Sequence, residues 1–161
     1  MTIEAWRIYK PRHAATAFSG TGAPDFGGRF NPKGVAIVYT AASVSLASLE
    51  MLVHLQTAEL LLAYVRRRVT FDHALVKRIT EADLPANWRA NPAPPESQRI
   101  GADWVAAAES AVLQVPSVVI PTESNFLLNP LHPDFKKLTF GKEEPFNFDP
   151  RLIKAPGLHG R

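Results

Sequence analysis

Arg29, Tyr39 and Glu50 carry side chains that could act together on one ligand. Arg29 follows two glycines, which let the backbone approach a ligand closely, and its planar guanidinium suits a phosphate or a diphosphate. The ring of Tyr39 can pack on a flat ring of a ligand. A carboxylate such as Glu50 stabilises the oxocarbenium-like centre that develops when a glycosidic bond breaks. Together these residue types favour cleavage of an N-glycosidic bond in a nucleotide that bears a diphosphate.

Each of these residues also has a purely structural interpretation. Arg29 would then be a surface charge and Tyr39 a core residue, while Glu50 would pair with His54 one helical turn on, or with a structural arginine. The neighbours of Glu50 are apolar, so its carboxylate loses hydration and needs either a partner or a task. The pattern of residues leaves both interpretations open.

The stretch that carries these residues predicts three consecutive elements. Residues 27–34 predict a glycine-rich turn, and the apolar residues 35–38 predict a buried strand that ends at Tyr39. Residues 41–50 predict a helix, which Ser43 or Ser45 would cap at its start. The helix is apolar around most of its circumference, so we expect it to be well buried in the centre of the fold.

The rest of the chain predicts short strands and one further helix. Trp88 in a surface loop over 87–95 would anchor that loop, and Arg66-Arg67-Arg68 would form a solvated edge. A long polar loop is expected over 121–133. The sum is an α+β fold, a single domain of short mixed strands with a central buried helix over 4–153, followed by a disordered tail over 154–161. The other expected elements are a helix over 96–108 and strands over 4–9, 60–70, 74–79, 111–115, 117–120, 136–140 and 146–153.

Composition excludes several classes of protein and site. The 161 residues fit one domain, and 46% hydrophobic residues are enough for an ordinary core. The absence of cysteine excludes disulfides and thiolate metal sites, and none of the five histidines has the paired spacing of a zinc site, so we expect no metal. A net charge of +3 without a basic stripe predicts no direct nucleic-acid binding. Without an apolar run long enough for a membrane, we expect a cytoplasmic protein.

Several motifs, in order along the chain, resemble the RES-domain toxins, which are the toxin halves of RES–Xre type II toxin–antitoxin systems. The resemblance spans nearly the whole chain, from Trp6-Arg7 to about residue 153, with Phe30 where tryptophan is commoner. The motifs are Gly28-Arg29-Phe30-Asn31, Val38-Tyr39-Thr40, Ala47-Ser48-Leu49-Glu50, Val115-Pro116-Ser117 and the loop from Pro121 to Phe135.

This resemblance implies a fold related to the ADP-ribosyltransferase toxins and consumption of NAD⁺ by hydrolysis, phosphorolysis or transfer of ADP-ribose to a protein. NAD⁺ would be the substrate, with no further cofactor, and an Xre-family antitoxin would cover the pocket. Arg29 and Glu50 match the arginine and glutamate that give the family its name, and Tyr39 matches the pocket tyrosine. For the family serine, Ser117 is the first choice and Ser124 the second. Further pocket candidates are Arg7, Asn31 and Asn125.

Two other functions are compatible with the sequence. A ribonuclease toxin would use Glu50 with His54, although the basic residues are scattered. A non-catalytic binding module would pair Arg29 with Glu50 inside the core and leave no cavity for a nucleotide. The acceptor of ADP-ribose, the identity of a protein target and the oligomeric state are not predicted.

Overall fold

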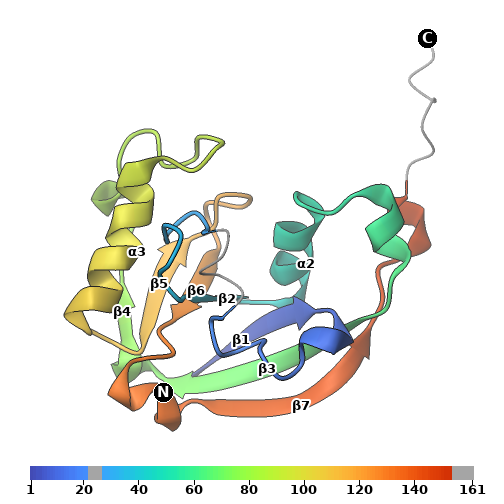
Figure 1. Cartoon of the computed structure of the whole chain (residues 1–161), viewed down its shortest axis with the longest axis horizontal. Coiled ribbons are helices and arrows are strands. Elements are labelled where there is room, and N and C mark those ends of the chain that lie inside the picture. The colour runs from blue at the N-terminus through green and yellow to red at the C-terminus, as the bar shows by residue number, and fades with distance from the viewer. Residues whose placement is uncertain (22–26, 154–161) are drawn as a thin grey trace.

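The computed structural model describes residues 1–21 and 27–153, which form one mixed sheet with two α-helices (Figure 1). The sheet has the strand order β4-β5-β6-β2-β1-β3-β7, in which β4 and β5 are parallel and the other neighbours antiparallel. The strands are β1 (Thr2–Tyr9), β2 (Val38–Ala41), β3 (Tyr64–Asp72), β4 (Val76–Arg78), β5 (Val112–Pro116), β6 (Ser124–Leu128) and β7 (Thr139–Phe146). The helices are α2 (Val44–Leu52) and α3 (Pro95–Ala107).

Both α-helices lie on the same face of the sheet, apart from one another (Figure 1). Leu127 of β6 belongs to the buried cluster around Trp104 of α3, and Ala41 of β2 to the cluster around Leu46 of α2. Leu127 pairs with Tyr39, so their side chains point to the same face of the sheet. Ala41 lies two residues after Tyr39 in β2, and its side chain therefore points to that face as well. The alternate residues form a third cluster on the other face, which includes Ala5, Val38, Val69, Phe126 and Leu128.

The sheet opens between β1 and β2. Only one pair of residues, Trp6 and Ala41, joins these strands in register, whereas β1 and β3 pair along their whole length. Arg7 fills part of the gap, since its Nη1 donates to the carbonyl of Tyr39 at 2.8 Å. The two helices and this gap leave a hollow on one face of the sheet.

The α+β class and the order of the main elements are confirmed. The strand over 4–9 and the helix over 96–108 are present as β1 and α3, and Ser43 rather than Ser45 caps α2, accepting from the amide of Leu46 at 3.0 Å. Trp88 is buried, as expected of an anchor. Helix α2 is less buried than its composition predicts, because Leu49 is 39% exposed and only Leu46 and Ala47 are buried.

Several expected strands were wrong. Residues 35–37 and 117–120 are not strands, and the polar loop over 121–133 contains the buried strand β6. One long strand, β7, replaces the strands expected over 136–140 and 146–153. Whether a segment forms a strand here depends on the neighbouring strands available to pair with it. Strand β6 forms between β2 and β5, and β7 forms against β3.

The run Arg66-Arg67-Arg68 was also misplaced, since β3 is an interior strand rather than an edge. Arg66 and Arg68 form ion pairs with Glu144 and Glu4. The tail expected over 154–161 lies outside the described residues.

Candidate active site

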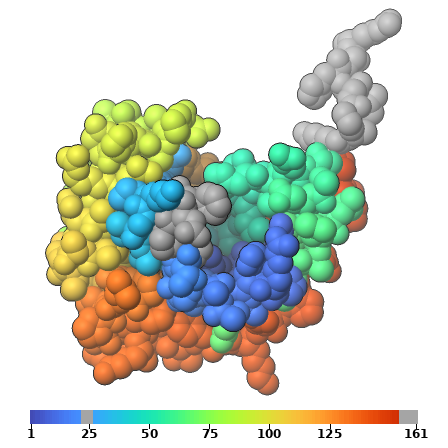
Figure 2. All heavy atoms as spheres, in the orientation of Figure 1, coloured from blue at the N-terminus to red at the C-terminus, as the bar shows by residue number. Residues whose placement is uncertain are grey.

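The hollow is a cleft of about 800 Å³ between α2, the turn that carries Arg29 and the loop before α3. The molecular surface is hollowed beside α2, drawn in teal (Figure 2). Residues far apart in the sequence line it, among them Arg7, Arg29, Tyr39, Glu50, His54 and Asn125. The cleft therefore gathers most of the candidate residues on one face of the sheet.

Glu50 reaches the cleft from the inner side of α2. It follows the buried residues Leu46 and Ala47 by one helical turn, so its side chain points towards the sheet. Its Oε1 accepts from Ser117 Oγ at 2.7 Å and from Asn125 Nδ2 at 2.6 Å. In the described part of the chain nothing donates to Oε2. Two donors on one oxygen hold the carboxylate in a single orientation and leave the other oxygen for a ligand.

Ser117 serves to position Glu50. Its side chain is fully buried and is not part of the cleft lining. The same Oγ that donates to Glu50 accepts from the amides of Val119 at 3.1 Å and Ile120 at 3.0 Å. The hydroxyl thus ties the bend after β5 to the carboxylate on α2. Because the hydroxyl is buried and outside the cleft lining, it has no access to a ligand in the cleft, and this does not suit a nucleophile.

Arg29 is held by the backbone of the loop before α3. Its Nη1 donates to the carbonyls of Trp88 at 2.7 Å and Ala90 at 2.8 Å, which uses both hydrogens of that nitrogen. The Nε and Nη2 edge makes no hydrogen bond with the described residues. Burial lowers the pKa of Arg29, and the nearby Glu50 carboxylate opposes this shift. The two side chains are thus within electrostatic reach, but they form no ion pair in the described structure.

The turn before Arg29 is shaped by Tyr39 and Asn31. The Tyr39 hydroxyl accepts from the amide of Phe30 at 3.1 Å and donates to Asn31 Oδ1. A Cβ on Gly28 would lie 2.7 Å from that hydroxyl, so only glycine fits this close approach. Asn31 is fully buried and its Nδ2 donates to the carbonyl of Val35 at 2.9 Å. Asn31 therefore builds the turn rather than lining the cleft, while Tyr39 lines it.

The hydroxyl of Tyr39 stays neutral in this setting. Burial raises the pKa of Tyr39 far above its ordinary value, and the hydrogen bonds to its oxygen and the nearby Arg29 oppose this shift only in part. A neutral hydroxyl can donate to Asn31 and accept from Phe30 at the same time.

Helix α3 docks directly on this turn. Gln98 Nε2 donates to the carbonyl of Gly28 at 3.0 Å. A Cβ on Gly101 would lie 1.7 Å from the carbonyl oxygen of Phe30, so the helix and the turn touch through their backbones. Gln98 and the loop residues 91–93 also line the cleft. No motif indicated Gln98 or this loop, because their place in the site depends only on packing.

Arg7 supplies a second cation at the floor of the cleft. Burial lowers the pKa of Arg7 to about 10. In residues 1–21 and 27–153 it forms no ion pair, and its Nε has no hydrogen-bond partner. Arg7 is half-buried, and a partly buried cation without a carboxylate partner is costly, so this site favours an anionic ligand.

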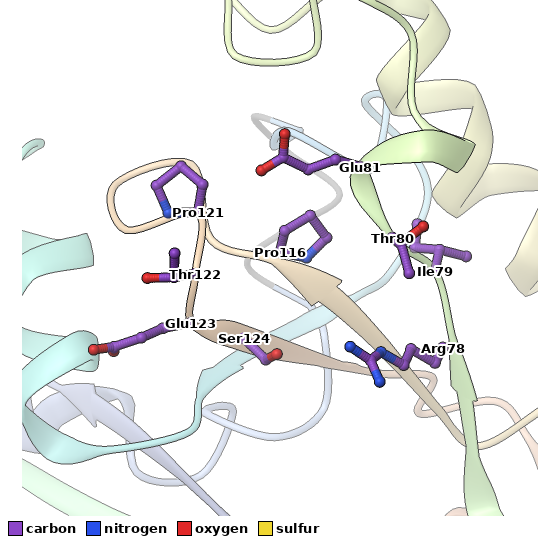
Figure 3. A pocket seen from close by; sticks show the side chains of 9 residues that line it. All are labelled: Arg78, Ile79, Thr80, Glu81, Pro116, Pro121, Thr122, Glu123 and Ser124. Carbon is purple, nitrogen blue, oxygen red and sulfur yellow. The ribbon is translucent and has the colours of Figure 1, made fainter.

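Ser124 lies away from the cleft. It lines a separate pocket of about 120 Å³ with Arg78 and Thr80 (Figure 3). Its Oγ accepts from Gln114 Nε2 at 2.9 Å. The structure therefore brings Ser117, and not Ser124, to Glu50.

The described residues contain no group of three or more histidine or acidic side chains placed to hold a metal ion. None of the helices in residues 1–21 and 27–153 has both the length and the apolar character that crossing a membrane requires.

The fold and the cleft define a small α+β domain in which an oriented carboxylate and two arginines line the same cleft. The RES domain family model matches residues 4–149. The chain therefore belongs to the RES domain family, and its resemblance to the RES-domain toxins is confirmed.

Named relatives agree with this family, and a solved structure shares the fold. A "Toxin Res" of Yersinia enterocolitica is 41% identical over 148 residues, which are 91% of this chain and 97% of that protein. The "Prs ADP-ribosylating toxin" of a Sphingobium species is 41% identical over 159 residues, 96% of this chain and 99% of that protein. The fold is similar to that of a chain in the M. tuberculosis MbcT–MbcA toxin–antitoxin complex, with a TM-score of 0.73, 18% identity and coverage of 95% and 87%.

Proposed function

We propose that this protein is a toxin that consumes NAD⁺ by cleaving the bond between nicotinamide and ribose. The observation that carries the proposal is the carboxylate of Glu50, held on one oxygen by Ser117 and Asn125, in the same cleft as the free edge of Arg29. The name of the Sphingobium relative, an ADP-ribosylating toxin, supports NAD⁺ as the substrate, because NAD⁺ is the usual donor of ADP-ribose.

The arginines bind the diphosphate. The carbonyls of Trp88 and Ala90 occupy Nη1 of Arg29, so the Nε and Nη2 edge presents a planar pair of donors to one phosphate. Arg7 adds positive potential at the floor of the cleft, where it has no carboxylate partner among the described residues. The diphosphate would offset the cost of keeping this half-buried cation without an anionic partner.

Glu50 acts at the breaking bond. The bond between the ribose carbon and the nicotinamide nitrogen breaks, and its electron pair leaves with nicotinamide, which becomes neutral and needs no general acid. Positive charge then develops on the ribose, where the carboxylate stabilises it. Its orientation is set in advance by Ser117 and Asn125, so little reorganisation accompanies the step. An acceptor then attacks the ribose carbon, and water as acceptor releases a proton.

Three acceptors would give three different products. Water gives ADP-ribose, inorganic phosphate gives ADP-ribose phosphorylated at the reacting ribose, and a protein side chain gives a modified protein. The name of the Sphingobium relative favours a protein acceptor for that relative. We propose transfer to a protein as the first reaction to test here, with hydrolysis and phosphorolysis as the competing reactions.

The alternatives gain less support from the geometry. If the protein were a non-catalytic module, Arg29 and Glu50 would form a buried ion pair with no cavity. Instead, these residues line a cleft of about 800 Å³, without an ion pair between them in the described structure. The ribonuclease hypothesis predicts that Glu50 pairs with His54. Instead, the Glu50 carboxylate accepts hydrogen bonds from Ser117 and Asn125.

The direct test incubates the purified protein with NAD⁺, with and without phosphate and with and without a cell lysate that supplies protein acceptors, and identifies the products by mass spectrometry. Glu50→Gln should lower the rate of nicotinamide release by about 10²–10³-fold, as loss of a preorganised electrostatic group does. Glu96→Gln, an exposed acid on α3 outside the cleft, is the matched control. A Glu50→Gln variant that releases nicotinamide at the wild-type rate contradicts the role of Glu50.

We further propose that an Xre-family DNA-binding antitoxin covers the cleft. Support comes from the toxin names of the relatives and from the similar fold in a toxin–antitoxin complex. Copurification with the product of the neighbouring gene, and displacement of bound ADP-ribose by that product, are the expected results. An antitoxin that binds while ADP-ribose stays bound would place the interface elsewhere.

A further inference from the structure

The amide of Gln98 is fixed in one orientation at the end of the cleft beside α3. Its Nε2 donates to the carbonyl of Gly28 at 3.0 Å, which places Oε1 on the opposite side of the amide group. The side chain lines the cleft, and Oε1 accepts no hydrogen bond from the described residues. The site thus offers a preset acceptor next to the turn that carries Arg29.

The order of groups along a dinucleotide determines what lies at this acceptor. This step rests on the proposed function, in which Glu50 faces the nicotinamide ribose and Arg29 the diphosphate. Glu50 approaches from α2, whereas Arg29 is bound to the loop before α3 through the carbonyls of Trp88 and Ala90. The remaining half of NAD⁺, the adenosine, would therefore extend beyond Arg29 towards α3.

This end of the cleft has the composition of a purine subsite. Pro92 and Ala93 give it apolar surface for a flat ring, and Asn91 adds an exposed amide. Adenine carries a 6-amino group, which donates hydrogen bonds. Hypoxanthine carries a carbonyl at the same position, which only accepts and would face the Gln98 oxygen.

We infer that Gln98 is a specificity-determining residue, whose side-chain oxygen accepts from the 6-amino group of adenine while its nitrogen holds the Arg29 turn. One side chain would then couple recognition of the purine to the placement of the diphosphate cation. The substrate class is accordingly adenine dinucleotides rather than nicotinamide dinucleotides in general.

The test compares nicotinamide release from NAD⁺ and from nicotinamide hypoxanthine dinucleotide. The wild-type protein should prefer NAD⁺ in kcat/KM by about tenfold or more, since the wrong base leaves the Gln98 oxygen unpaired. Gln98→Met, which keeps the length but has no polar atoms, should bring the ratio close to one. Gln98→Met also loses the hydrogen bond to Gly28, which should lower kcat/KM for both substrates by the same factor. The ratio of the two kcat/KM values therefore separates recognition of the base from positioning of the turn.

Arg99→Ala is the matched control, because Arg99 is the next residue of α3, is exposed and lies outside the cleft lining. It should keep the wild-type ratio. A wild-type ratio near one, or a Gln98→Met variant that keeps the wild-type ratio, would overturn the inference.

Binding of AMP and IMP, measured by calorimetry, tests the subsite without catalysis. AMP should bind the wild-type protein about tenfold more tightly than IMP, and Gln98→Met should bind both alike. Equal binding of the two nucleotides by the wild-type protein overturns the inference. Preferential binding of AMP without any release of nicotinamide from NAD⁺ would support the subsite and reject the proposed reaction.

Discussion

At the scale of single residues, neighbouring groups hydrogen-bond to some atoms of Glu50 and Arg29 and leave the other polar atoms of these side chains available to a ligand. Ser117 and Asn125 occupy one oxygen of Glu50, and two backbone carbonyls occupy one nitrogen of Arg29. The other oxygen of Glu50 and the Nε and Nη2 edge of Arg29 receive no partner from the described residues. Such partial use fixes the orientation of a charged group and keeps a bonding face for the ligand.

Ser117→Ala tests the positioning role. Nicotinamide release should fall by about tenfold, because Glu50 loses one of its two donors, but it should stay well above that of Glu50→Gln. The protein should also lose stability, since the amides of Val119 and Ile120 lose their acceptor. Steady-state assays and urea denaturation measure both effects.

Ser48→Ala is the control for Ser117→Ala, because the Ser48 hydroxyl donates to the carbonyl of Val44 within α2 and not to Glu50. Detection of ADP-ribose covalently bound to Ser117 would show that the hydroxyl is a nucleophile and would reject the positioning role.

Arg29→Lys tests the geometry of the cation. A lysine ammonium cannot bind two carbonyls and a phosphate edge in the way a guanidinium does. The KM for NAD⁺ should rise by about tenfold or more, with a smaller change in kcat. Arg89→Lys changes an exposed arginine of the same loop and should leave both parameters as in the wild type. An unchanged KM in Arg29→Lys would argue against binding of the diphosphate by Arg29.

At the scale of elements, α3 acts as the support of the Arg29 turn. Gln98 and Gly101, one turn apart along the helix, meet the backbone of Gly28 and Phe30. Buried Trp104 anchors the same helix to the sheet. The position of Arg29 therefore depends on a helix that comes much later in the sequence.

Gly101→Ala should push α3 away from the turn, because the new Cβ would lie 1.7 Å from the Phe30 oxygen. A loss of about 1–3 kcal/mol in the free energy of unfolding is expected from this overpacking, with a loss of activity as Arg29 moves. Gly141→Ala is the control, since its Cβ would meet only ordinary contacts at 3.5 Å. Wild-type stability and activity in Gly101→Ala would show that the contact relaxes without moving the turn.

At the scale of the whole molecule, one sheet carries the cleft, and several short turns connect its strands. Aspartates cap some of these turns: Asp72 accepts from the amide of Ala74 at 2.8 Å, and Asp83 from that of Thr80 at 2.7 Å. These hydrogen bonds hold the pKa of Asp72 and of Asp83 below the usual 3.8. Their contribution to stability is therefore present above that value.

The free energy of unfolding should fall as the pH falls below about 4. Between the folded pKa of these aspartates and 3.8, the unfolded chain binds more protons than the folded chain, which favours unfolding. Urea denaturation at pH 7 and at pH 3 measures the difference. Asp83→Asn should reduce that difference, and an unchanged difference in this variant would exclude Asp83 as a source of the pH dependence.

Local features of the sequence were enough to predict several elements, and most of the candidate site residues line one cleft. The apolar residues after Ser43 specify a capped helix, and Gly27-Gly28 before Arg29 specifies a close turn. The α+β class followed from many short apolar runs with few helical ones. Such features depend on residues close together in the chain, where propensity and spacing act directly.

The tertiary structure alone decided which residues meet in the cleft and which atoms stay free. Residues 121–133 predicted a loop, yet β6 forms there because β2 and β5 supply its partners, and this pairing brings Asn125 to Glu50. Gln98 had no signal in the sequence, and the hydrogen bonds alone show that Ser117, rather than Ser124, contacts Glu50. These outcomes depend on contacts between segments far apart in the chain, which short-range propensity does not specify.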